Sequence, residues 1–212
     1  MRAAVIENWP ERSIGSERAA ELDQRAAPRF TSLIRAAKLV GAQGEFVCVL
    51  RDVSSTGVRL RCFHALPHDK TIALVLQNGE TFEIERVRDD GQEASFRFLS
   101  PVSVSSLVQE SWLYPRRPLR LNLAIPLSLR TATGPVAAIT QNISQQGCRA
   151  ETMMKLALSQ SVLIDSPHLP GIRAKVRWRR DGVCGLVFDD TFSLTDFARL
   201  TARLQCPALM GK

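Results

Sequence analysis

The sequence repeats itself at an almost constant spacing, and this duplication restricts the fold more than any other feature of the chain. Three kinds of landmark recur: an Arg-x-x-x-Arg pair, an [Asp/Asn]-x-Ser-x-x-Gly segment and a Phe near the end of the repeat. The matched residues are Arg25 and Arg29 with Arg116 and Arg120 at an offset of 91, and Asp52, Ser54, Gly57 and Phe98 with Asn142, Ser144, Gly147 and Phe188 at an offset of 90. Separate landmarks rarely keep one offset by chance, so we expect two copies of one domain.

Each copy contains short runs rich in β-branched and aromatic residues, separated by Gly, Asp, Asn or Pro, which is typical of strands joined by turns. In the first copy the expected strands are Leu33–Val40, Glu45–Val53, Val58–Phe63, Thr71–Gln77, Thr81–Val87 and Ala94–Leu99. In the second copy they are Leu123–Thr131, Val136–Ile143, Cys148–Ala150, Ser161–Ile164, Ala174–Arg179 and Cys184–Phe188. Six short strands per copy predict an antiparallel barrel.

A helix is expected at the end of each copy. In the second copy Ser193 is a candidate N-cap with Asp196 at the capping-box position, and the apolar residues that follow share one helical face. These residues are Leu194, Phe197, Leu200 and Leu204, and the weaker helix of the first copy spans Ser103–Trp112. The predicted fold class is therefore mainly β: two tandem six-stranded antiparallel β-barrels, each followed by a C-terminal α-helix. We expect a mobile N-terminal segment over residues 1–20, a first domain over 21–112 and a second over 113–212.

The chain is basic, and most of its positive charge is arginine. It carries 28 Lys and Arg against 21 Asp and Glu, for a formal charge of +7, and only 5 of the cations are Lys. The planar guanidinium suits bidentate contacts to phosphate and to guanine edges, so an anionic partner fits this composition. A basic strand around Trp178 offers nucleic-acid binding as an alternative, although we expect Trp178 to pack under the helix or at the domain junction.

Catalysis, metal binding and membrane insertion have little support in the sequence. The five cysteines lie far apart without a C-x-x-C pair, and we expect reduced thiols in a cytoplasmic protein. No run of eighteen apolar residues occurs, so no membrane insertion is expected. His64, His68 and His168 lie near no nucleophile motif, and the acidic pairs Asp89–Asp90 and Asp189–Asp190 are expected to be solvated turns.

The Arg pairs and the downstream turn together suggest a binding site. Two further pairs, Arg173/Arg177 and Arg199/Arg203, have ordinary explanations on a strand and a helix face, whereas the first two pairs precede the turn by 22 or 23 residues. In the turn, Asp or Asn can accept hydrogen bonds, Ser can donate and accept, and we expect Gly to supply a positive φ. Beside two guanidinium groups, such a turn can hold guanine and phosphate.

These segments resemble the PilZ domain family. The resemblance rests on RAAPR at 25–29, DVSSTG at 52–57, RRPLR at 116–120 and NISQQG at 142–147, with KVRWRRDGVCGLVF at 175–188 and ERVRDDGQEASFRF at 85–98 as closing segments. It covers about residues 22 to 206. It implies a six-stranded barrel with a C-terminal helix that binds cyclic di-GMP without converting it, with no other cofactor.

The resemblance also implies the roles of individual residues. The ligand-binding residues it assigns are Arg25, Arg29, Asp52, Ser54 and Gly57 in the first domain and Arg116, Arg120, Asn142, Ser144 and Gly147 in the second. An amide at Asn142 lacks the charged acceptor pair of Asp52, a loss of about tenfold in affinity. We therefore expect the first domain to be the main site and ligand closure to re-orient the barrels toward an unidentified protein partner. A tandem module without ligand in one or both domains is the alternative.

Overall fold

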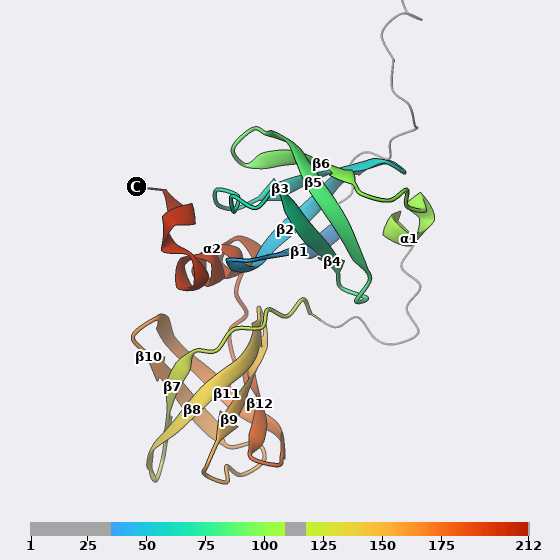
Figure 1. Ribbon diagram of the computed structural model, residues 1–212. Helices are drawn as coiled ribbons and strands as arrows, with labels where there is room; N and C mark the ends of the chain where they lie inside the picture. The colour runs from blue at the N-terminus through green and yellow to red at the C-terminus, as the bar shows by residue number, and fades with distance from the viewer. Residues whose placement is uncertain (1–34, 109–117, 212) are drawn as a thin grey trace, which may run out of the picture.

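The computed structural model describes residues 35–108 and 118–211, which form two barrels of antiparallel strands (Figure 1). The first contains β1 (Arg35–Gly41), β2 (Gly44–Val53), β3 (Gly57–Cys62), β4 (Thr71–Leu76), β5 (Thr81–Asp89) and β6 (Glu93–Phe98). The second contains β7 (Pro126–Thr131), β8 (Gly134–Ser144), β9 (Gly147–Thr152), β10 (Ser161–Ser166), β11 (Leu169–Arg180) and β12 (Val183–Phe188). The helices are α1 (Val104–Val108), α2 (Leu194–Gln205) and the 3-10 helix η1 (Pro207–Met210). The expected segment 1–20 lies outside the described residues, as do Arg25, Arg29 and Arg116.

The two barrels have the same topology, which confirms the predicted fold class. Both are closed, with strand orders β1-β2-β3-β6-β5-β4 and β7-β8-β9-β12-β11-β10 arranged alike. Even the irregularities in strand register repeat. The register shift between Leu50 and Asp52 in β2 recurs between Thr140 and Asn142 in β8. A second register shift, in β5, recurs at the matching position of β11. Because a β-bulge bends and re-aims its strand, its conservation at an offset of 90 shows that the duplication extends to backbone detail.

Alternation of side chains across each strand builds the two cores. In β3, Val58, Leu60 and Cys62 are buried while Arg59 and Arg61 face outward, and β9 shows the same period of two. No helix among the described residues is both long and apolar enough to cross a membrane.

Strand β2 departs from this alternation because both of its faces are covered. Phe46–Leu50 is buried without interruption, whereas the matching part of β8 alternates and leaves Ile139 about half exposed. The covering element is α2, which follows the second barrel in sequence and lies beside the first barrel in Figure 1. Residues buried on both strand faces produce a continuous apolar run.

Helix α2 joins the two hydrophobic cores. It begins at the predicted N-cap, where the Ser193 hydroxyl accepts a hydrogen bond from the Asp196 amide at 3.1 Å. Phe197 and Ala198 belong to the core of the second barrel, while Ala202, one turn further, belongs to that of the first. The helix is therefore a common structural element of both barrels rather than an appendage of the second.

The hairpin between β1 and β2 is shaped by Gly44, which lies against α2. Gly44 has a φ of +131°, and a Cβ on it would lie 2.4 Å from Oε1 of Gln205. Its counterpart Gly134 in the second barrel has a nearly identical φ of +124°, but nothing lies within 4 Å of a Cβ there. The two glycines thus share one backbone requirement, and Gly44 has an additional packing requirement.

Replacement of each glycine by alanine should separate these two requirements. Gly134→Ala is expected to destabilise the protein by about 1–3 kcal/mol through the backbone alone. Gly44→Ala should lose at least about 1 kcal/mol more, because Gln205 must move and give up its contacts with β2. Urea unfolding of both variants measures the difference. Equal losses would contradict the close packing of α2 on this hairpin.

Candidate functional site

A cavity of about 570 Å³ opens on the outer surface of the second barrel. It lies where the segment before β7 crosses the β8–β9 turn and faces β11 and β12. Its described lining residues are Pro118, Arg120, Asn142, Cys148, Arg149, Arg177, Trp178, Gly185, Leu186 and Val187. Ligand pockets for molecules of drug size typically span about 300–1,000 Å³, so this cavity can hold a small organic ligand.

The strap of residues 118–122 delivers Arg120 to this cavity. Leu121 forms an isolated antiparallel bridge with Ile143 through two backbone hydrogen bonds of 2.9 Å each. Because side chains alternate along an extended segment, Arg120 points away from buried Leu121, and its Nη1 donates to Oδ1 of Asn142 at 2.7 Å. The structure therefore brings together two residues that the sequence assigned to one site from separate motifs.

Ser144 and Gly147 shape the β8–β9 turn from within. Ser144 is fully buried, and its hydroxyl donates to the Gly147 carbonyl at 3.0 Å. Gly147 does not have the positive φ expected from the sequence, and neither does Gly57. Glycine is required there for another reason: a Cβ on Gly147 would lie 2.2 Å from the carbonyl oxygen of Leu186 on the adjacent strand. The motif glycine allows two strands to approach, and the motif serine secures the turn.

Trp178 forms one wall of the cavity. The sequence-based expectation that it packs under the helix or at the domain junction is wrong, because its side chain is 42% exposed and lines the cavity. A Cβ on Gly185 would lie 2.1 Å from Trp178 Nε1, so the absence of a side chain on β12 lets the indole lie across that strand. Arg149 places its guanidinium carbon 5.9 Å from the ring centroid, within cation–π range.

Cys148 lines the cavity as a neutral thiol. Burial, reinforced by the nearby Cys184, raises the pKa of the Cys148 thiol to about 12, while the positive charge of Arg120 opposes this change. A thiol with so high a pKa is almost fully protonated at neutral pH and is a poor nucleophile. The described residues also contain no group of three or more His, Cys, Asp or Glu side chains that could hold a metal ion.

The matching region of the first barrel differs in charge and size. Arg59, the counterpart of Arg149, lies 2.5 Å from Glu93 and 3.8 Å from Asp52, so two carboxylates neutralise it. In the second barrel Val183 occupies the position of Glu93, and Arg149 has no ion pair among the described residues. The cavity that Asp52, Gly57 and their described neighbours line measures about 50 Å³, against about 570 Å³ in the second barrel.

Net charge follows the same division between the barrels. Residues 35–108 contain nine Lys and Arg and nine Asp and Glu, whereas residues 118–211 contain eleven and six. The excess cations of the described chain are therefore on the barrel that has the larger cavity. A positive surface around a cavity favours an anionic ligand through its local potential.

The sequence located part of this site. Of the residues that the sequence assigns to ligand binding, Arg120 and Asn142 line the cavity, Ser144 and Gly147 support its turn, and Asp52, Ser54 and Gly57 form the equivalent turn of the first barrel. The sequence missed Arg149 and Trp178 as lining residues and treated Arg177 as a solvated strand position. The available signal was the cluster KVRWRR beside Gly185, because the glycine opposite Trp178 creates the space.

Comparison with known proteins identifies the family of the second barrel. Residues 114–205 match the PilZ domain, which confirms the resemblance for this part of the chain. The second barrel is therefore a PilZ domain, and the first repeats its strand order. No curated protein sequence matched the chain significantly.

Solved structures with similarity to the chain include several with PilZ domains or bound c-di-GMP. Borreliella burgdorferi PlzA in complex with c-di-GMP is 10% identical, covering 82% of this chain and 88% of that one, with a TM-score of 0.33. Bacillus subtilis MotI is 12% identical, covering 83% and 94%, with a TM-score of 0.33. The K. pneumonia MrkH complex with c-di-GMP is 13% identical, covering 78% and 83%, with a TM-score of 0.31.

Proposed function

We propose that this protein is a non-enzymatic receptor for cyclic di-GMP and that its second barrel holds the ligand. The observation that carries the proposal is the 570 Å³ cavity, which lies on the PilZ barrel and combines Arg120, Asn142, Arg149 and Trp178. Cyclic di-GMP carries two phosphates and two guanines, so it needs cations, hydrogen-bond acceptors and a stacking surface. The cavity provides all three.

Each lining residue has a chemical task in this proposal. Arg120 can bind a phosphate or the O6 and N7 edge of a guanine, and Asn142 can accept from a guanine N–H through its amide oxygen. The exposed face of Trp178 can stack on a guanine ring. Arg149 and Arg177, which line the same cavity, supply positive charge beside it. Arg116 completes the Arg pair that the family resemblance assigns, although it lies outside the described residues.

The choice of the second barrel reverses the ranking suggested by the sequence. Asp52 is the stronger acceptor for guanine, but its neighbour Arg59 is neutralised and the described cavity beside it is about 50 Å³. For the first barrel alone, these observations favour another function, that of a structural or partner-binding module derived from a ligand-binding domain. Arg25 and Arg29, which the family resemblance assigns to that barrel's ligand site, lie outside the described residues.

The receptor would transmit its signal through the relative arrangement of the barrels, in the cytoplasm, to a protein partner not yet identified. Support comes from α2, whose residues contribute to both cores, and from the strap that carries Arg120. Ligand binding can shift such an equilibrium only if the two arrangements differ in affinity for the ligand. Contacts of Arg116 and Arg120 with the phosphates of the ligand, made in only one of the two arrangements, would supply that difference in affinity.

Isothermal titration with cyclic di-GMP tests the assignment of the site. Arg120→Ala should weaken binding at least tenfold, because a charged contact to the ligand is lost and Asn142 loses its orienting partner. Asp52→Ala removes the first barrel's counterpart of Asn142 and should leave the affinity within about twofold. Loss of binding with Asp52→Ala alone would move the site to the first barrel, and no heat from wild type would end the proposal.

The proposed stacking surface makes a second prediction. Trp178→Ala should weaken cyclic di-GMP binding by about tenfold, since stacking on an aromatic ring is worth about 1–3 kcal/mol per base. Arg88→Ala, at the equivalent position of the first barrel, serves as the control and should leave the affinity unchanged. Competition with a fluorescent cyclic di-GMP analogue measures both. Equal affinity of the Trp178 variant and wild type would show that the indole does not contact the ligand.

A further inference from the structure

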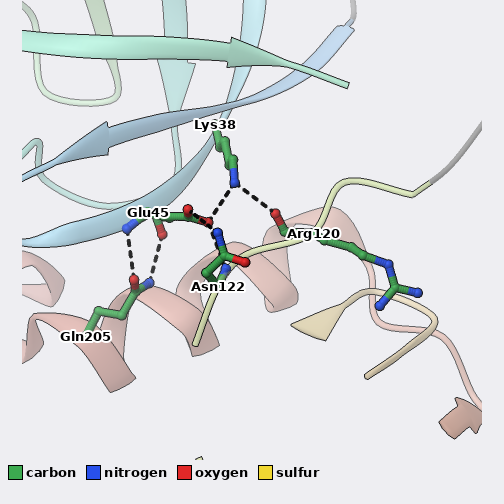
Figure 2. A network of polar contacts seen from close by, with 5 residues as sticks. All are labelled: Lys38, Glu45, Arg120, Asn122 and Gln205. Carbon is green, nitrogen blue, oxygen red and sulfur yellow. Dashed lines mark hydrogen bonds and ion pairs between the residues drawn. The ribbon is translucent and has the colours of Figure 1, made fainter. Parts of the chain in front are cut away.

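Glu45, at the start of β2 in the first barrel, contacts the strap that carries Arg120. Its carboxylate accepts one hydrogen bond from Lys38 Nζ, one from the backbone N–H of Asn122 and one from Asn122 Nδ2, each at 2.8 Å (Figure 2). The Glu45 side chain is only 13% exposed. Hydrogen bonds to a charged acceptor that is largely shielded from water are among the stronger polar contacts in proteins.

The backbone of Glu45 is held in turn by α2. The Glu45 N–H donates to Gln205 Oε1 and the Glu45 carbonyl accepts from Gln205 Nε2, both at 2.8 Å (Figure 2). The same Nε2 also donates to the Thr201 carbonyl at 3.0 Å, one turn back along α2. Gln205 therefore fixes the hairpin tip of the first barrel against α2 and determines where the carboxylate points.

Arg120 makes contacts with both barrels. Its carbonyl oxygen accepts from Lys38 Nζ at 3.2 Å, whereas its side chain extends away from Lys38 (Figure 2). The Arg120 guanidinium donates instead to Asn142 on the second barrel. The strap is thus fixed by Leu121 pairing with Ile143 on the second barrel and by Lys38 and Glu45 on the first. Its position depends on both.

We propose that Glu45 is a positioning residue for the ligand site: through Asn122 and Lys38 it holds the strap so that Arg120 faces the cavity. The first barrel thereby sets the affinity of the second barrel for its ligand. Glu45 contributes without touching the ligand, and the inference rests on the proposed function of the cavity. By linkage, a ligand that engages Arg120 stabilises the contact between the barrels by the same factor.

Glu45→Gln is the most conservative test of this role. The amide keeps the size of the side chain but has one acceptor oxygen instead of two and no charge, so it cannot accept from both Asn122 groups and Lys38. Titration with cyclic di-GMP should show about a tenfold weaker Kd. Glu83→Gln is the matched control, because Glu83 is exposed on β5 of the same barrel and loses the same charge. Its Kd should equal that of wild type.

A double-mutant cycle separates positioning from a general loss of stability. In an Arg120→Ala background, Glu45→Gln should weaken binding further by less than about twofold, because there is no guanidinium left to position. Asn122→Ala keeps Glu45 intact, removes a donor from the strap itself and should give a Kd similar to that of Glu45→Gln. This second variant keeps the test valid if Glu45→Gln fails to fold.

The outcomes distinguish this inference from the proposed function. If wild type binds cyclic di-GMP and both Glu45→Gln and Asn122→Ala bind equally well, Glu45 has no positioning role although the receptor assignment stands. A full tenfold loss in the Arg120→Ala background would likewise overturn the role, since the effect would not act through Arg120. If wild type does not bind, the receptor assignment itself fails and the positioning role fails with it.

Discussion

The packing of α2 against both barrels is the contact on which the rest of the arrangement depends. Phe197 and Ala198 lie in the core of the second barrel, and Ala202 lies in that of the first. This contact explains why β2 is buried on both faces, why Gly44 must lack a side chain and why Gln205 can hold Glu45. An apolar contact between two domains thus places a polar network beside a ligand-sized cavity.

Duplication produced two barrels with one backbone plan and different surfaces. The bulges, the strand order and the Ser-x-x-Gly turns recur at an offset of 90, while a few outward-facing positions have changed. The second barrel has Trp178, Gly185 and Val183 where the first has Arg88, Ser95 and Glu93. These differences open a cavity, and they leave Arg149 without the ion pair that its counterpart Arg59 makes with Glu93. Differences of this size are enough to give the second barrel a ligand-sized cavity where the described part of the first barrel has a small one.

The sequence predicted the fold well because strand alternation, turn residues and the repeat are local or periodic signals. All twelve strands and the capped α2 occur close to the expected positions. It predicted Arg120 and Asn142 as neighbours from their motifs, but it gave the wrong reason for Gly147 and misplaced Trp178. Those outcomes depend on which strand lies opposite, as with the Leu186 carbonyl and Gly185.

The contacts of Glu45 could not be predicted from the sequence at all. Its partners Asn122 and Gln205 lie 77 and 160 residues away, and no motif marks any of the three. The continuous apolar run Phe46–Leu50 was the available signal that a further element covers β2, although it does not identify that element.

Hydrogen–deuterium exchange with and without cyclic di-GMP tests the central claim directly, because it reports the site and its coupling in one experiment. The account predicts slower exchange in the strap 118–122 and the turn 142–147, together with slower exchange in the hairpin 41–45 of the first barrel. Protection confined to residues 52–57 of the first barrel would contradict the account.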